Sequence, residues 1–279
     1  MSLSPGVSVG PYLIIEQIGR GGMAAVYKAY EDSLARHVAI KVLPEFFAEE
    51  KEYRVRFQVE AVAVAKLRHL NIVSVFAYGE ENGQPYIVSE FMDGGTLAER
   101  LEGALPVESV IPLLEPIASA LDYAHSQGVL HRDIKPSNIM MVGEQSTPVL
   151  TDFGLAKILE SDTITLTGQV LGTPEYMAPE LCAGEEAGPS ADVYSLGVVA
   201  YQMLTGRVPF KGNTPGATII SQIHDPLPPP QEVNPDLPPA VAAVLDKVLA
   251  KVPEDRYQSA GDFVSALAAA TTSTPLEAA

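Results

Sequence analysis

Three glycines fall within four positions in the stretch GRGGMAAVY at residues 19–27, and their backbone amides could hold a phosphate group. The same spacing also suits a tight, flexible hairpin, because glycine adopts the backbone angles that turns require. β-rich runs lie on both sides, so the helix of a dinucleotide fingerprint is missing, and no Gly-Lys-Ser/Thr of a Walker loop follows. The loop alone leaves both interpretations open.

A second candidate is Lys41, at the end of the apolar run Val-Ala-Ile-Lys at residues 38–41. Taken alone, such a lysine packs its aliphatic stem on the core and extends its amine to solvent. Glu60 lies in a helical pattern further along the chain. It offers a buried ammonium the opposite charge that it needs.

The most informative residues lie in HRDIKPSNIM at 131–140 and TDFGLAK at 151–157. Singly, Asp133 suits a turn, Asn138 a cap and Asp152 the start of a loop. In this order and at these separations they resemble the catalytic loop and the metal-binding motif of protein kinases, His-Arg-Asp-x-x-x-x-Asn and Asp-Phe-Gly. Together with GGM in the glycine loop, they are most similar to bacterial serine/threonine protein kinases of the eukaryotic type.

This resemblance implies transfer of the γ-phosphoryl group of ATP to Ser or Thr hydroxyls of protein substrates. The reaction needs oxygen ligands for a metal ion, a carboxylate that receives the hydroxyl proton, and cations on the phosphates. By resemblance, Asn138 and Asp152 bind Mg²⁺, with Mn²⁺ as an alternative. Asp133 faces the hydroxyl, and Lys135 neutralises the γ-phosphate. Lys41, fixed by Glu60, grips the α- and β-phosphates.

The resemblance also implies a set of ATP-binding residues. The glycine loop would cover the phosphates, and Val26 would contact the adenine. The expected set is Ile18, Gly19, Arg20, Gly21, Gly22, Val26, Ala39, Lys41, Glu90, Met92 and Met140.

The resemblance extends from about Tyr12 to Leu267 and includes GTPEYMAPE at 172–180, which is similar to the substrate loop and the Ala-Pro-Glu motif. It implies that Asp192, at the start of a long helical pattern, holds the backbone of the catalytic loop. It also implies that Arg256 pairs with Glu180 as an architectural contact.

Substrate type and regulation follow from the same comparison. Lys135 and Thr173 are the choices of serine/threonine kinases rather than tyrosine kinases. Arg132 comes just before the expected catalytic aspartate. In the family, an arginine at this place commonly pairs with a phosphorylated residue of the activation loop, and the resemblance implies the same role for Arg132. Thr165 and Thr167 are the expected autophosphorylation sites, with a merely polar, mobile loop as the alternative.

Three positions depart from the family pattern. Ala24 replaces the third glycine of the loop, so we expect weakened nucleotide cover. Ser89 stands at the gatekeeper position, where a small side chain should open a back pocket to bulky inhibitors. Leu70 replaces a proline, which we expect to matter little. None of these changes removes a catalytic group.

Two alternatives of other classes remain in view: a pseudokinase scaffold and a small-molecule kinase of the same fold. A pseudokinase would lack at least one of five residues, and the sequence has all of them. A small-molecule kinase typically lacks the Ala-Pro-Glu motif. The five residues are Lys41, Glu60, Asp133, Asn138 and Asp152.

The elements that must position these residues change in character along the chain. Short alternating runs predict five strands and one helix up to residue 91, and longer three- and four-residue spacings predict helices after it. We therefore expect an α+β, bilobal protein-kinase-like fold. The expected parts are a tail at 1–11, a kinase domain at 12–270 and a tail or linker at 271–279. The N-lobe, 12–91, has a five-stranded antiparallel sheet and one main helix, and the larger, mainly helical C-lobe is 92–270.

Composition limits the partners. Among 279 residues, 18 Lys and Arg oppose 35 Asp and Glu, a net charge of −17 that should repel nucleic acid and anionic membranes. No apolar run approaches the roughly 18 residues of a membrane span, and no signal peptide begins the chain. Cys182 is the only cysteine, which agrees with a reducing compartment. We expect a cytoplasmic location, with membrane anchorage of a longer protein and N-lobe pairing of two copies left open.

Overall fold

The computed structural model describes residues 3–20, 24–143, 146–153 and 173–272. Of these, the residues up to Asp93 form a first unit, and the residues from Gly94 onward form a second. The change of unit coincides with the change from strand-like to helix-like sequence patterns.

The first unit is built on an antiparallel sheet with the strand order β1-β2-β3-β4-β6-β5. Strand β4 shows the pattern that buries one of its faces: Val38, Ile40 and Val42 are buried, and Ala39 and Lys41 between them are partly exposed. Because side chains alternate along a strand, Ala39 and Lys41 share the face opposite these three buried residues. The strands are β1 (Ser8–Val9), β2 (Tyr12–Arg20), β3 (Ala25–Glu31), β4 (Arg36–Val42), β5 (Val75–Glu81) and β6 (Gln84–Glu90).

The sequence-based prediction of five strands was wrong, because the sheet has a sixth. Ser8 and Val9 pair with Leu13 and Tyr12 of β2. Gly10 makes this return possible through its φ of 55°, a left-handed angle that glycine adopts at little cost. Val9 is then buried against the sheet core, and two residues are too short to show a strand pattern in the sequence.

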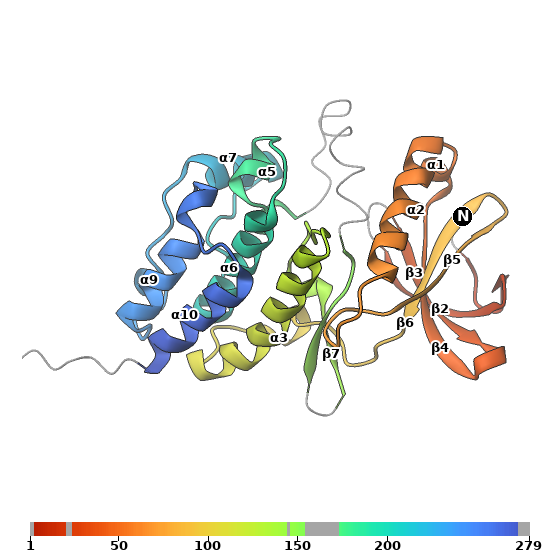
Figure 1. The fold of residues 1–279 in the computed structure, drawn as a ribbon, viewed down its shortest axis with the longest axis horizontal. Coiled ribbons are helices and arrows are strands. Elements are labelled where there is room, and N and C mark those ends of the chain that lie inside the picture. The colour runs from red at the N-terminus through yellow and green to blue at the C-terminus, as the bar shows by residue number, and fades with distance from the viewer. Residues whose placement is uncertain (1–2, 21–23, 144–145, 154–172, 273–279) are drawn as a thin grey trace, which may run out of the picture. The chain divides into compact units, whose positions relative to one another are not determined.

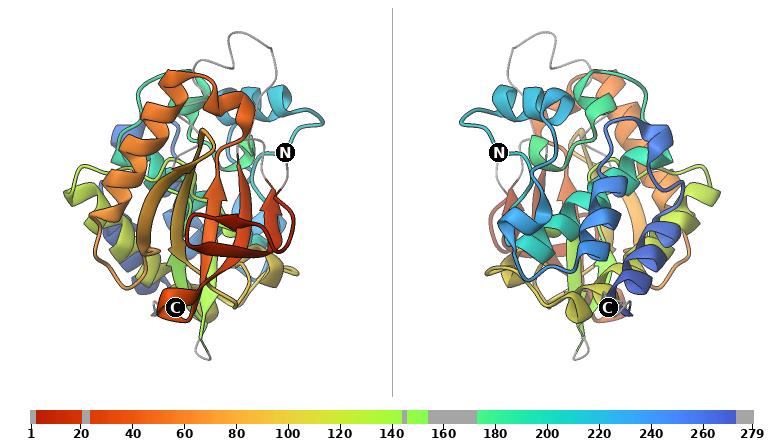
Figure 2. Two further views of the ribbon diagram at one scale, coloured as in Figure 1. Left: turned by 90° about the vertical axis from the view of Figure 1, so that its right-hand side faces the viewer. Right: turned by 90° about the vertical axis from the view of Figure 1, so that its left-hand side faces the viewer.

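Helices α1 (Glu45–Ala48) and α2 (Lys51–Ala65) lie in the same unit, with α2 along one side of the sheet beside β5 and β6 (Figures 1 and 2). Its inner face buries Phe57 and Ala61 against Leu43 and Ile87. This helix is the main helix that the sequence predicts for the N-lobe.

The second unit is mainly helical, and its helix α6, which contacts α3, α9 and α10, is buried along most of its length. Helix α10 lies beside α3, and the Asp122 carboxylate on α3 accepts hydrogen bonds from the first amides of α10, Ala260 N (2.9 Å) and Gly261 N (2.8 Å). This contact satisfies amides that a helix start leaves without partners. The helices are α3 (Val107–Ser126), α5 (Pro179–Cys182), α6 (Pro189–Thr205), α7 (Pro215–His224), α8 (Pro230–Val233), α9 (Pro239–Val248) and α10 (Ala260–Thr272).

A small hairpin of β7 (Ile139–Val142) and β8 (Thr147–Leu150) completes the second unit and follows the catalytic-loop sequence directly. The segment at 94–97 runs beside β7, where the Met141 amide donates to the Gly95 carbonyl at 2.9 Å. A side chain at Gly94 would place its Cβ 1.6 Å from the Met141 carbonyl oxygen, so only glycine fits there. Among the described residues, no helix has the length and apolar character needed to cross a membrane.

Candidate active site

The loop at residues 131–133 is held by one buried carboxylate at the start of α6. Asp192 Oδ2 accepts the His131 amide at 2.8 Å, and Oδ1 accepts the Arg132 amide at 2.7 Å. Arg132 has a φ of 63°, a left-handed angle that is unfavourable for a residue with a side chain. The second of these hydrogen bonds stabilises that backbone conformation.

His125, at the end of α3, is a positioning residue that the sequence reasoning missed. Its Nε2 lies 2.8 Å from Asp192 Oδ2. Burial by itself would raise the pKa of Asp192, but hydrogen bonds from the His125 ring and the His131 amide outweigh it and hold that pKa below its ordinary value. The signal in the sequence that could have identified His125 is its place in the last turn of a helix, six residues before His131.

His131 links the two motifs of the site. Its ring Nε2 lies 3.0 Å from the Thr151 carbonyl, and its Nδ1 accepts the Asp133 amide at 3.3 Å. Burial lowers the pKa of His131, so the ring is neutral and carries its proton on Nε2. The ring also contacts the buried Phe153, with 4.5 Å between ring centroids.

The predicted catalytic residues of this loop lie in direct contact. Asp133 Oδ2 is 2.8 Å from Lys135 Nζ and accepts a hydrogen bond from Asn138 Nδ2 at 2.9 Å. The same Nδ2 donates to the Asp133 carbonyl at 2.8 Å. The Asn138 carbonyl accepts the Thr151 amide at 2.9 Å, which ties this loop to the start of the second motif. Asp152, which follows Thr151, is exposed and has a φ of 55°.

The structure also brings Glu180 and Arg256 together. The guanidinium donates twice to the carboxylate, with two distances of 2.8 Å, and both residues are buried. Its remaining donors reach the carbonyls of Ala250, Ser190 and Lys251. Every charge and donor of this pair is therefore satisfied, as a buried ion pair requires.

The segment after Thr173 is fixed on α6 and α7 by polar contacts that the sequence did not reveal. The Tyr176 hydroxyl donates to Gln202 Oε1 at 2.6 Å, and Ser195 Oγ donates to the Tyr176 carbonyl at 2.7 Å. Gln222 Nε2 donates to the Glu175 carbonyl at 2.7 Å. Thr173 itself is exposed.

In the first unit, several predicted ATP-binding residues share one face of the sheet. On β4, Lys41 lies opposite Val26 of β3, and Ala39 lies opposite Ser89 of β6. These positions alternate with the buried Val38, Ile40 and Val88, so they lie on the other face of the sheet, which also carries Leu43 and Ile87. Ile18 is 46% exposed on β2.

Some predicted residues cannot be placed. Gly21, Gly22, Thr165 and Thr167 lie outside the described residues. Arg20 is the last residue of β2, and Glu60 lies in α2. For both residues the structure describes the backbone but not the side chain. Gly19 pairs with Val26, Glu90 ends β6, Met92 follows it, and Met140 lies on β7 of the second unit.

Comparison with known proteins shows to which family this chain belongs. The sequence matches the family described as protein kinase domain over residues 12–266. The chain belongs to the protein kinase family. It is 41% identical over 277 residues to the serine/threonine-protein kinase PknA of Mycobacterium tuberculosis, which covers 96% of this chain and 63% of PknA.

Two further comparisons agree with this assignment. A probable serine/threonine-protein kinase of Clostridium acetobutylicum is 40% identical over 258 residues, 92% of this kinase domain and 39% of that protein. The crystal structure of the PknI kinase domain of Mycobacterium tuberculosis superimposes with a TM-score of 0.76 at 32% identity, covering 96% of this chain and 100% of that one. The chain thus spans 39% and 63% of the length of the two curated relatives.

These findings confirm the identification as a bacterial serine/threonine protein kinase catalytic domain and the α+β kinase fold. They favour an ATP-dependent protein kinase over a pseudokinase scaffold. Within the described ranges, no three or more His, Cys, Asp or Glu side chains gather as a metal-binding cluster.

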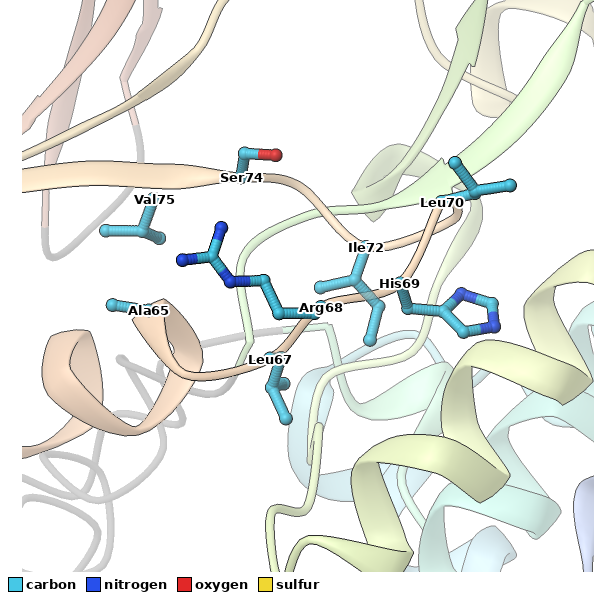
Figure 3. Close-up of a pocket in the computed structure, with 8 residues that line it drawn as sticks. All are labelled: Ala65, Leu67, Arg68, His69, Leu70, Ile72, Ser74 and Val75. Carbon is cyan, nitrogen blue, oxygen red and sulfur yellow. The ribbon is translucent and has the colours of Figure 1, made fainter.

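The kinase domain has a separate hollow of about 290 Å³ in its first unit, between the end of α2 and β5 (Figure 3). The Arg68 side chain points toward Ser74 and Val75 there, while Leu70, which is 94% exposed, points away. None of the predicted catalytic or ATP-binding residues lines this hollow. It is therefore not part of the candidate active site.

Proposed function

We propose that this kinase domain transfers the γ-phosphoryl group of ATP to Ser or Thr hydroxyls of protein substrates. The observation that carries the proposal is the Asp133 carboxylate, which is oriented by Lys135 and Asn138 on a loop that Asp192 holds in place. A carboxylate held in this way can orient a substrate hydroxyl and accept its proton. Lys135, 2.8 Å from that carboxylate, can neutralise the γ-phosphate that approaches the same hydroxyl.

The donor set fits Mg²⁺, with Mn²⁺ as the alternative. The Asn138 side chain donates two hydrogen bonds through Nδ2, to the carbonyl and the carboxylate of Asp133, so its amide oxygen is the atom suited to a metal ion. The Asp152 carboxylate supplies a second hard oxygen ligand. Mg²⁺ usually keeps waters and substrate phosphates as its other ligands, which agrees with so small a set. When bound, the ion neutralises charge on the ATP phosphates.

The first unit supplies the nucleotide contacts in this proposal. Lys41 grips the α- and β-phosphates with Glu60 as its partner, and the glycine loop covers the phosphates. Val26 and Ala39 contact the adenine from the face of the sheet that they share with Lys41. Ala24 weakens this cover, and Ser89 leaves room for bulky inhibitors beside Ala39.

Regulation of this kinase domain is proposed to pass through Arg132. Its backbone is held by Asp192, so its side chain extends from a fixed point of the loop. A phosphate on Thr165 or Thr167 would pair with that guanidinium. Mass spectrometry after incubation with ATP tests this step, and an unmodified loop in an active sample would exclude it.

We propose that the substrates of the whole protein are proteins. We also propose that this domain lies in the cytoplasm, and the alternative is that a longer chain attaches it to a membrane. Pairing of two copies through the first unit is a further proposal. Sedimentation at increasing concentration tests it, because a mass that stays at one chain would exclude pairing.

The decisive experiment replaces Asp133 by Asn. Purified protein with Mg²⁺ and labelled ATP should phosphorylate itself or a generic protein substrate. The Asp133→Asn variant should lose that transfer while it keeps most of its ATP affinity, since the change leaves the nucleotide contacts untouched. Asp236→Asn, at an exposed position, is the matched control and should stay active. Wild-type protein that transfers no label with any divalent metal would favour the scaffold instead.

A further inference from the structure

Gln222 connects α7 to the segment after Thr173 and to α6. The residue is fully buried. Its Nε2 donates to the Glu175 carbonyl at 2.7 Å and to the Pro174 carbonyl at 3.2 Å. Its Oε1 accepts the Tyr194 hydroxyl at 2.6 Å. Both ends of the amide are therefore engaged, and only one orientation of the group satisfies all three contacts.

The end of α7 that carries Gln222 is held from a second direction by Lys251. The Gln222 carbonyl lies in the last turn of the helix, and the residue four positions on is Pro226, which has no amide N–H to donate. Lys251 Nζ donates to this carbonyl at 2.7 Å and to the Ser221 carbonyl at 3.4 Å. A cation is favourable there, because the carbonyl end of a helix carries partial negative charge. Lys251 therefore fixes the turn from which the Gln222 side chain extends.

The Lys251 amine is itself held in a defined place. Its Nζ lies 3.9 Å from the centroid of the buried Phe210 ring. Burial lowers the pKa of Lys251 to about 8, and Arg256 lowers it further, while Asp225 and the Cys182 thiol act in the opposite direction. The amine is thus mostly protonated at neutral pH, and its hydrogen bonds to α7 are charge-assisted.

The two carbonyls that Gln222 holds belong to a short turn at Pro174–Tyr176, directly after the exposed Thr173. Within this turn the Met177 amide donates to the Pro174 carbonyl at 3.1 Å. The hydrogen bonds from Gln222 attach the turn to α7 at its first two residues. They therefore set the direction in which the chain continues from Thr173.

We infer that Gln222 is a positioning residue for the protein substrate, because it fixes the turn at Pro174–Tyr176 against which the substrate binds, and that Lys251 and Tyr194 orient it. The inference rests on the proposed function, since the segment at 172–180 is the expected substrate loop. Gln222 acts through this segment and not on the reacting atoms. Loss of its amide should therefore weaken binding of the protein substrate and leave the nucleotide contacts, which are proposed for other residues, unchanged.

The first test replaces Gln222 by Met, which has a similar length but neither donor nor acceptor for these contacts. With a Ser- or Thr-containing peptide that the wild type phosphorylates, KM for the peptide should rise about tenfold, the effect of losing hydrogen bonds to the turn. KM for ATP and the rate of ATP hydrolysis in the absence of peptide should stay unchanged. A merely structural defect would instead lower kcat and the hydrolysis rate together. Hydrogen exchange at the Met177 amide should become faster, which is a readout that needs no activity.

A matched pair of tyrosines on α6 gives a second test that removes a single oxygen atom. Both tyrosines are fully buried, and the Tyr194 hydroxyl donates to Gln222, whereas the Tyr201 hydroxyl donates to the Pro228 carbonyl at 3.2 Å. Tyr194→Phe should raise KM for the peptide about threefold or more. Tyr201→Phe should leave it unchanged. This pair decides the inference even if Gln222→Met does not fold.

Three results would overturn the inference while the proposed function stands. The first is a peptide KM that is equal in the wild type and in Tyr194→Phe, and the second is an equal rise in Tyr201→Phe. The third is a KM for ATP that rises in parallel with that for the peptide. If the wild type labels no peptide and no protein, the proposed function fails, and the inference fails with it.

Discussion

The contacts of the buried pair between Arg256 and Glu180 allow the cost of breaking it to be worked out. Arg256→Met leaves the Glu180 carboxylate buried without its cation, which typically costs about 3–5 kcal/mol. It also removes the donor from the carbonyls of Ala250, Ser190 and Lys251, at up to about 1 kcal/mol each. We therefore expect the free energy of unfolding to fall by about 3–8 kcal/mol.

A loss of that size is a large part of the roughly 5–15 kcal/mol that stabilises an ordinary domain. Urea unfolding followed by far-UV circular dichroism measures it, because the chain has no tryptophan for fluorescence. Hydrogen exchange at the amides of α6 reports separately on the second unit. The matched control is Arg207→Met, at an exposed arginine of the same unit, which should change stability by less than about 0.5 kcal/mol.

A second variant separates the charge pair from the carbonyl contacts. Glu180→Leu combined with Arg256→Met leaves neither charge buried, so it should cost less than the sum of the two single changes. The reasoning is refuted if Arg256→Met lowers the free energy of unfolding by less than about 1 kcal/mol, or if the two single effects simply add.

Three further predictions follow from individual contacts. Asp192→Asn turns an amide group toward backbone donors, so kinase activity should fall by about tenfold or more in a folded protein, and a fully active variant in the labelled-ATP assay would contradict this. Burial lowers the pKa of Lys251 to about 8 from 10.5. Between these values the unfolded chain binds more protons, so stability should rise with pH there. Lys251→Met should flatten the rise in urea unfolding at several pH values, and parallel profiles would exclude this origin. Gly94→Ala should lower the melting temperature through its clash with Met141, whereas Gly103→Ala, which meets open space, should not; equal melting temperatures would argue against the clash.

The expected catalytic loop could be identified in the sequence because its residues are close together and their types suit the proposed chemistry. Asp133, Lys135 and Asn138 lie within six positions, and the structure places them in contact. Residues that act through tertiary contacts gave no such signal. Gln222 is 47 positions from Glu175, and its role depends on how α7 packs beside the segment after Thr173.

The same distinction explains the errors and gaps in the fold. A nine-residue strand shows its alternation in the sequence, but the two residues of β1 show none, so the sixth strand was missed. His125 resembled an ordinary histidine at a helix end. Only the fold shows that it meets a carboxylate 67 positions away.

One helix explains how the two loops of the second unit are held in register. Asp192 and Ser195 lie three positions apart on α6, so they occupy the same face of the helix. Asp192 holds the loop that presents Asp133, and Ser195 holds the carbonyl of Tyr176, next to Glu175. The predicted proton acceptor and the segment after Thr173 are thus both anchored to a single, almost fully buried helix. Because the same helix anchors both loops, a substrate hydroxyl held by the segment after Thr173 would be positioned relative to Asp133 without any ordering of the loops during the reaction.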